Sequence, residues 1–179
     1  MIKKNEENIK FIWRVVAAHV IAYFIAGILA SQVLYCQDWF LNGVLSSVMR
    51  PANAPIVVLG ICLQVIRGLI MALVLLPMRR VFIEGKYGFL IFWLLIVGLS
   101  VISTFAAAQS SMDGFIYMKI SLMEHIIGYP VAILWISLFT GILWVLYKYE
   151  KKAINIIAIV LFVLIVLMST AGYFAVLSK

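Results

Sequence analysis

The stretch Pro55-Ile-Val-Val-Leu-Gly-Ile-Cys-Leu-Gln-Val-Ile-Arg-Gly-Leu-Ile-Met-Ala-Leu-Val-Leu-Leu-Pro77 decides the fold class of this chain. At a helical rise of about 1.5 Å per residue, it is long enough to cross a hydrocarbon core about 30 Å thick. Arg67 lies near its middle, with Gln64 about one turn before it and Gly68 directly after it. A charged guanidinium at that depth is costly in lipid, so we expect Arg67 to face protein, water or a ligand.

The composition of the whole chain agrees with this stretch. Of the 179 residues, 66% are hydrophobic and 12% are charged. A soluble domain of this size cannot hide so much apolar surface. No Pro/Gly/Ser-rich linker or long polar block divides the sequence, so we expect a single domain over residues 1–179, embedded in the cell membrane as a multi-pass protein.

Five apolar runs follow one another, and each is predicted to form a membrane-spanning helix, which makes the chain an all-α integral membrane protein. In the first long connection, Asp38 is a candidate helix cap and the apolar residues after it fall on one face. We therefore predict an interfacial or re-entrant helix over residues 38–49. The five predicted spans cover residues 11–30, 56–77, 89–108, 125–146 and 153–177.

The orientation of the helices follows from the distribution of Lys and Arg. The N-terminus, the connection over residues 78–88 and the connection over residues 147–152 carry ten of them, counting Arg14 with the N-terminus, whereas the other side carries three. Because cytoplasmic loops hold the excess of positive charge, we expect the N-terminus in the cytoplasm and the C-terminus outside. The net charge of +7 is thus a topology signal. No basic groove or aromatic platform indicates nucleic-acid binding.

Polar residues recur near the middle of the predicted spans. Arg67 is expected about 16 Å from the outer face and His19 about 12 Å from the inner face of a core about 30 Å thick. Ser100 and Ser137 lie at nearly the same level, and Gln64 and Ser103 lie slightly further out. These residues are therefore expected to meet in the interior of the bundle.

The counter-charge of Arg67 cannot come from its own level, because no acidic residue lies inside any predicted span. Three alternatives remain. An outer-loop carboxylate, from Asp38, Asp113 or Glu124, reaches down; Gln64 and backbone carbonyls satisfy the guanidinium internally; or an anion enters from outside. The candidate ligand-binding residues are His19, Gln64, Arg67, Ser100, Ser103, Asp113 and Glu124.

Small residues predict where the helices approach one another most closely. The first span carries an alanine at every fourth position, and the second carries two glycines on the face that bears Arg67. Small residues in register let backbones pack closely in lipid. The predicted helix-packing residues are Ala18, Ala22, Ala26, Ala30, Gly60 and Gly68.

No catalytic or metal signature appears, and two cysteines and two histidines form neither a disulfide framework nor a zinc pattern. We expect no cofactor. The leading hypothesis is a non-enzymatic helical bundle with an outward-facing polar pocket around Arg67, which binds or transports a small anionic or amphipathic molecule or a lipid headgroup. The alternative is an accessory subunit, in a homo-oligomer or with another membrane protein, in which Arg67 is purely structural. A small intramembrane enzyme is a third hypothesis.

Overall fold

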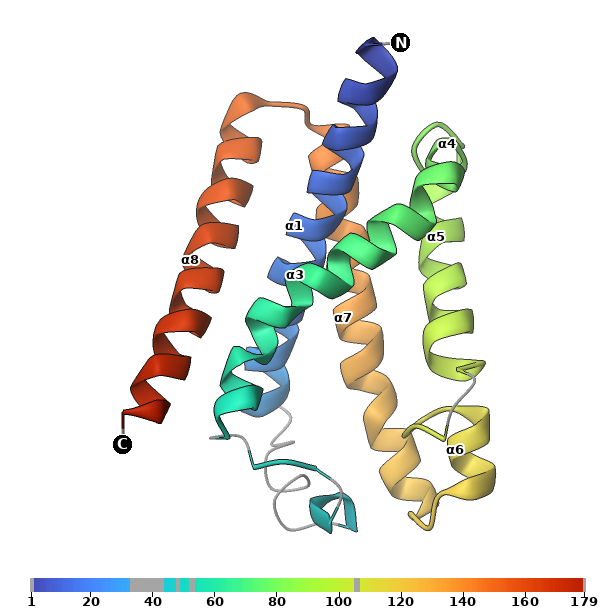
Figure 1. Cartoon of the computed structure of the whole chain (residues 1–179). Helices are drawn as coiled ribbons and strands as arrows, with labels where there is room; N and C mark the ends of the chain where they lie inside the picture. The colour runs from blue at the N-terminus through green and yellow to red at the C-terminus, as the bar shows by residue number, and fades with distance from the viewer. Residues whose placement is uncertain (1, 33–43, 48, 52–53, 105–106, 179) are drawn as a thin grey trace.

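The computed structural model describes residues 2–32, 44–47, 49–51, 54–104 and 107–178, and within these ranges all regular structure is helical (Figure 1). The all-α fold with about five apolar helices is therefore confirmed. In chain order the elements are α1 (Ile2–Gln32), η1 (Val44–Ser47), α3 (Pro55–Leu75), η2 (Leu76–Met78), α4 (Arg79–Ile83), α5 (Gly88–Val97), the π-helical η3 (Gly98–Ile102), α6 (Met112–Tyr117), α7 (Leu122–Lys148) and α8 (Lys152–Leu177).

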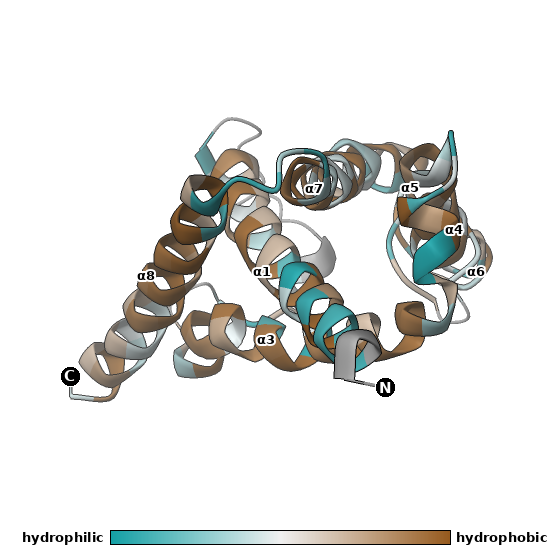
Figure 2. Ribbon diagram, turned by 90° about the horizontal axis from the view of Figure 1, so that it is seen from above, coloured by the Kyte–Doolittle hydropathy of each residue, from teal (hydrophilic) through white to brown (hydrophobic). Residues whose placement is uncertain are grey.

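The first helix forms the centre of the bundle. Seen along the bundle, α1 lies among α3, α7 and α8, and it packs against all three (Figure 2). In its apolar segment 56% of the residues are buried, whereas the other three long helices reach only 11–22%. The sequence stretch around Arg67 therefore belongs to a peripheral helix, and α1 is the element around which the others pack.

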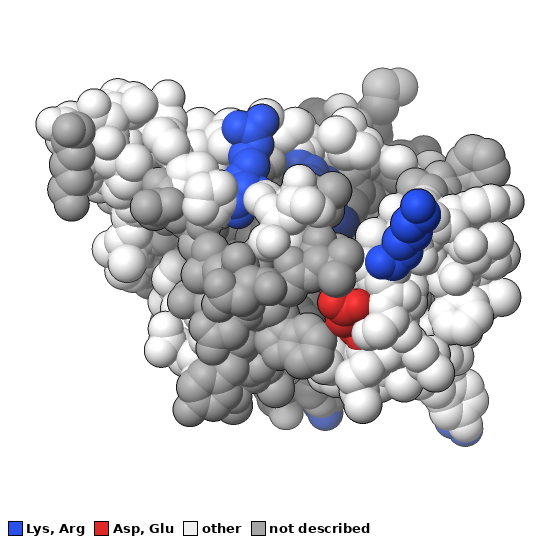
Figure 3. Space-filling model, turned by 90° about the horizontal axis from the view of Figure 1, so that it is seen from below, with Lys and Arg blue, Asp and Glu red and all other residues white. Residues whose placement is uncertain are grey.

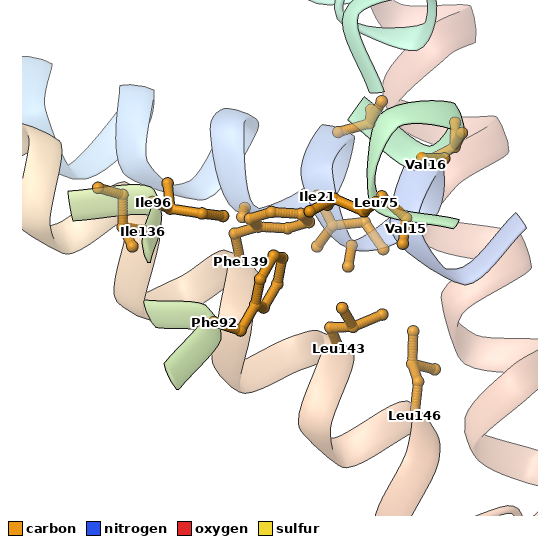
Figure 4. Close-up of a cluster of buried hydrophobic side chains, with 14 of the residues drawn as sticks. Val15, Val16, Ile21, Leu75, Phe92, Ile96, Ile136, Phe139, Leu143 and Leu146 are labelled. Atoms are coloured by element: carbon orange, nitrogen blue, oxygen red, sulfur yellow. The ribbon is translucent and has the colours of Figure 1, made fainter. Parts of the chain in front are cut away.

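The interior of the bundle is filled by apolar side chains from α1, α3, α5 and α7 (Figure 4). Phe92 of α5 meets Phe139 of α7 edge-on, with ring centroids 5.6 Å apart. Val15 and Ile21 of α1 and Leu75 of α3 complete the same cluster. Offset and edge-on aromatic pairs add to the contact energy of the buried area, so this cluster is the main packing contact of α5 with the rest of the bundle.

Four helical segments are long and apolar enough to cross a membrane, namely Asn5–Gln32, Pro55–Ile83, Leu122–Lys148 and Lys152–Leu177. The third predicted span, residues 89–108, is different. Its helix runs only over Gly88–Ile102 and ends in the π-turn η3. Thr104 donates its hydroxyl proton to the carbonyl oxygen of Ser100 at 2.6 Å. The last backbone bond of this helix runs from the Ser103 N–H to the Gly98 carbonyl oxygen, five residues back, at 2.8 Å.

The helix of the second span also departs from its predicted end at Pro77. Helical structure continues through η2 and α4 as far as Ile83. Pro77 lies in the first turn of η2, where its missing N–H group leaves no bond unmade. The interfacial helix predicted over residues 38–49 lies largely outside the described residues, which contain the short 3-10 turn η1 there.

The three Lys/Arg-rich segments gather at one end of the bundle. The Arg79 guanidinium contacts the Glu7 carboxylate at 2.8 Å, and Lys10 contacts Glu150 at 2.7 Å, so ion pairs join all three segments. The two chain termini lie at opposite ends of the molecule (Figure 1). Hydrophilic residues, teal in Figure 2, gather at the end that holds the N-terminus. We call it the basic end. Seen from the other end, the described surface carries only scattered charges (Figure 3).

Candidate functional site

A buried polar contact joins α1 to α3 near the middle of the bundle. His19 is fully buried, and its Nε2 lies 3.2 Å from the Oε1 atom of Gln64. A hydrogen bond to an amide oxygen requires the tautomer with its proton on Nε2, which makes Nδ1 an acceptor. This Nδ1 atom is buried and has no hydrogen-bond partner within the described part of the chain. The contact therefore leaves one polar atom of His19 unsatisfied.

Arg67 and His19 meet on a third side chain, Trp135 of α7. The Arg67 Cζ atom lies 5.5 Å from the centre of the Trp135 ring, and the His19 ring meets the same indole edge-on at 5.5 Å. Phe139, one turn further along α7, stacks on Trp135 with an interplanar angle of 10°. The Trp135 Nε1 atom is buried without a partner within the described residues. Three helices thus contribute to one polar site, which we call the Arg67 site: His19, Gln64, Arg67 and Trp135.

Arg67 stands on the open side of this site. It is the thirteenth residue of the 21-residue helix α3 and is exposed, as is its neighbour Ile66 at 58%. Its position is about 18 Å along the helix axis from Pro55, which is mid-depth for a membrane-spanning helix. In the described ranges no carboxylate lies within 4 Å of its guanidinium. Among the described residues, the group that lies against the guanidinium is the ring of Trp135.

The outer-loop carboxylates considered as partners are not ion-paired with Arg67. Glu124 caps α7 through a capping box, in which its Oε2 atom accepts a hydrogen bond from the Ser121 backbone N–H at 2.6 Å. It lies eleven residues before Trp135 on α7, about 16 Å along the helix axis. Asp113 lies in the first turn of α6, which packs on α7. In the described residues neither Asp113 nor Glu124 pairs with Arg67, and the third outer-loop acid, Asp38, lies outside them.

The serines predicted at the same level lie elsewhere. Ser100 and Ser103 are exposed, on and just after η3. Ser137 accepts a hydrogen bond from the Trp93 indole N–H at 3.0 Å, on the side of α7 that meets α5. Equal depth thus did not bring these serines to Arg67, because depth says nothing of the direction in which a side chain points around its helix axis.

The predicted packing residues fall into two groups. Ala18, Ala22, Ala26 and Ala30 are all buried on the central helix. On α3, a Cβ atom added to Gly68 would lie 3.2 Å from Val16 Cα, so the two helices approach closely there. A Cβ atom added to Gly60 would meet nothing within 4 Å, and that glycine does not mark a close contact.

Two polar residues outside the predicted set carry substantial contacts. Arg14 is 1% exposed, its Nη1 lies 3.0 Å from Glu150 Oε1, and its Cζ lies 4.4 Å from the Tyr147 ring centre. Hydrogen bonds from Lys10 and Arg14 hold the pKa of the Glu150 carboxyl below its ordinary value.

Ser169 of α8 accepts a hydrogen bond from the Cys62 backbone N–H and donates one to the Val58 carbonyl oxygen. These two bonds join α8 to α3.

A sequence signal existed for one further residue, Trp135. It lies ten residues inside its predicted span, deeper than the membrane interface at which tryptophan is enriched.

In the described part of the chain, no three His, Cys, Asp or Glu side chains gather closely enough to hold a metal ion. No protein-family profile, curated protein or solved structure matches the chain, so its function is inferred from these contacts alone.

Proposed function

We propose that this polytopic membrane protein binds an anionic amphipathic molecule, a carboxylate or a phosphate ester, at the Arg67 site. The observation that supports the proposal is the guanidinium of Arg67, exposed at mid-depth of an apolar helix with no carboxylate within 4 Å in the described residues. A permanent charge at this depth requires a partner. An anion that also carries an apolar chain would neutralise the guanidinium and contact the apolar side chains around it.

The geometry around Arg67 suits such a ligand. A guanidinium presents a planar fork of N–H donors that matches carboxylate and phosphate oxygens. Trp135 lies against this group at 5.5 Å, and Trp135 Nε1 and His19 Nδ1 are a buried donor and a buried acceptor without a partner in the described residues. Large exposed apolar side chains surround Arg67 on α3, among them Leu63, Ile66 and Ile70. They would contact the apolar part of the ligand.

The same exposure supports a second candidate, an accessory subunit of a membrane complex or of a homo-oligomer. Exposed apolar side chains cover much of α3 and α8, and the apolar segment of α3 is only 11% buried. In such an assembly a carboxylate of the partner would meet Arg67. If the cation–π contact with Trp135 suffices, Arg67 would instead be purely structural.

Thermal unfolding of the purified protein in neutral detergent tests the proposal, with oleate and phosphatidic acid as probes. An anion at about 100 times its Kd should stabilise the wild-type protein by about 2.7 kcal/mol. Arg67→Met should keep the fold and lower this shift, and Arg67→Lys should lower it less, because a point charge replaces a bidentate fork. Arg50→Met, which removes an exposed charge outside the site, is the matched control and should leave the shift unchanged.

The proposal is lost if neither probe raises the wild-type melting temperature more than that of Arg67→Met. If, in addition, Arg67→Met is as stable as wild type without any probe, the charge is structural. If it instead lowers the mass of the detergent-solubilised complex in light scattering, the accessory-subunit reading replaces the ligand.

A further inference from the structure

A second region, separate from the Arg67 site, has the form of a lipid site. Two cavities of about 350 Å³ and 320 Å³ lie along the contact of α5 with α7. Phe89 and Trp144 line both of them, so the two form a pair of adjoining cavities. We call this the α5–α7 groove. Arg67 lines neither cavity, and the groove starts at the basic end of the bundle.

One end of the groove is positively charged. Lys86, from the connection before α5, and Lys148, the last residue of α7, both line the first cavity. Aromatic rings lie against both ammonium groups: Lys148 Nζ is 4.2 Å from the Trp144 ring centre, and Lys86 Nζ is 5.3 Å from that of Tyr87. α5 also begins at this cavity without a side-chain cap, so its first-turn N–H groups add to the positive potential.

Three of the four acidic residues of this end, all except Glu6, lie within 4 Å of other basic side chains. Glu150 holds Lys10 and Arg14, and Glu7 holds Arg79. Glu84 lies 4.0 Å from Arg80. In the described residues neither groove lysine forms an ion pair within 4 Å. The lysines therefore present uncompensated charge to whatever occupies the cavity.

The other end of the groove is apolar and lies deeper in the bundle. Ser137, Gly141 and Trp144 succeed one another at helical spacing on the face of α7 that meets α5. From Lys148 to Ser137 the groove extends about 16 Å along α7, toward mid-depth. Trp93 closes its deep end by donating a hydrogen bond to Ser137 at 3.0 Å. Gly141 has no side chain, and a Cβ atom added to it would meet nothing within 4 Å. The groove is therefore open at this position.

We propose that the α5–α7 groove binds an anionic phospholipid, with its phosphate between Lys86 and Lys148 and an acyl chain along Trp144 and Gly141. The polarity of the groove matches this occupant: cations stand where a headgroup lies at the membrane surface, and an apolar trough leads inward from them. A free phosphate would use the lysines alone, and a purely apolar molecule would use the trough alone.

Native mass spectrometry and thermal unfolding of the full chain in neutral detergent test this proposal, with phosphatidylglycerol, phosphatidylcholine and water-soluble glycerol phosphate as the three probes. Phosphatidylglycerol should remain bound and raise the melting temperature more than phosphatidylcholine, and glycerol phosphate should not raise it. The double variant Lys86→Gln/Lys148→Gln should lose more than half of the phosphatidylglycerol shift. The control Lys151→Gln/Lys152→Gln removes the same charge from the same end. Neither of these lysines lines a cavity, so this variant should retain the shift.

Gly141→Leu tests the acyl-chain trough, because it fills the groove without touching its charges. It should reduce the phosphatidylglycerol shift, whereas Gly27→Leu, at an exposed position that is equally open, should not. The proposal is overturned if both lysine pairs lower the shift equally, if glycerol phosphate reproduces it, or if Gly141→Leu leaves it intact. The part of the phosphatidylglycerol shift that depends on the groove lysines is the difference between Arg67→Met and the triple variant Arg67→Met/Lys86→Gln/Lys148→Gln. This part should persist without Arg67, so failure here is distinct from failure of the Arg67 proposal.

Discussion

Two arginines within the apolar helices of this protein differ in their exposure and in their partners. Arg14, on the central helix α1, is 1% exposed, and its guanidinium is held between Glu150 and the ring of Tyr147. Arg67, on the peripheral helix α3, is exposed, and in the described residues only the Trp135 ring lies against it. The protein itself supplies a carboxylate to Arg14, whereas the described residues supply none to Arg67. A charge in an apolar helix thus indicates function only when its own chain leaves it unpaired.

The largest expected effect concerns the partner of Arg14. Glu150→Gln would leave a buried guanidinium without its carboxylate, and we expect a loss of about 2 kcal/mol, below the usual 3–5 for a buried pair because half of Glu150 is exposed. Arg14→Met should cost less, because Glu150 remains solvated and keeps Lys10. Melting temperatures in neutral detergent measure both, with Glu84→Gln as an exposed control close to wild type. Equal losses for Glu150→Gln and Arg14→Met would contradict the asymmetry.

The central position of α1 gives a second prediction, of comparable size. Ala22 is fully buried, so Ala22→Leu should overpack the helix contact at a cost of about 1–3 kcal/mol. Gly27→Leu, five residues on, enters open space and serves as the control. Thermal unfolding of the two variants distinguishes the faces of α1. A stability of Ala22→Leu equal to that of Gly27→Leu would mean that this face of α1 is not the packed one.

The smallest expected effect is a dependence on pH. Because the folded-state pKa of Glu150 is lowered, chiefly by the Lys10 hydrogen bond and then by that of Arg14, the folded chain binds fewer protons at this site than the unfolded chain. Its contribution to stability is present above the ordinary glutamate pKa of about 4.3 and is lost as the pH falls through the lower folded value. Melting temperatures from about pH 6 to about pH 3 should therefore fall less steeply for Glu150→Gln. Parallel curves for the two proteins would show that Glu150 does not contribute.

Part of the Arg67 site could be predicted from the sequence. His19, Gln64 and Arg67 were expected at one level, and the structure joins His19 to Gln64 and brings His19 and Arg67 to the same indole. Depth follows directly from counting residues along a helix, so level is readable from sequence. Ser100 and Ser103 share that level and yet lie elsewhere, because counting residues does not reveal which neighbour a helix face meets.

The sequence by itself determined that this chain belongs in lipid, that its apolar runs are mainly helical, and that its basic segments share one end. These are properties of composition and of local periodicity, which each segment carries alone. Only the tertiary structure decided that α1 is central, that Arg14 is buried while Arg67 is exposed, and that Glu124 caps its own helix. A membrane helix is apolar on its lipid face and on its packed face alike, so hydropathy does not distinguish them. Which face is buried depends on close packing with particular neighbours, and that packing exists only in the folded bundle.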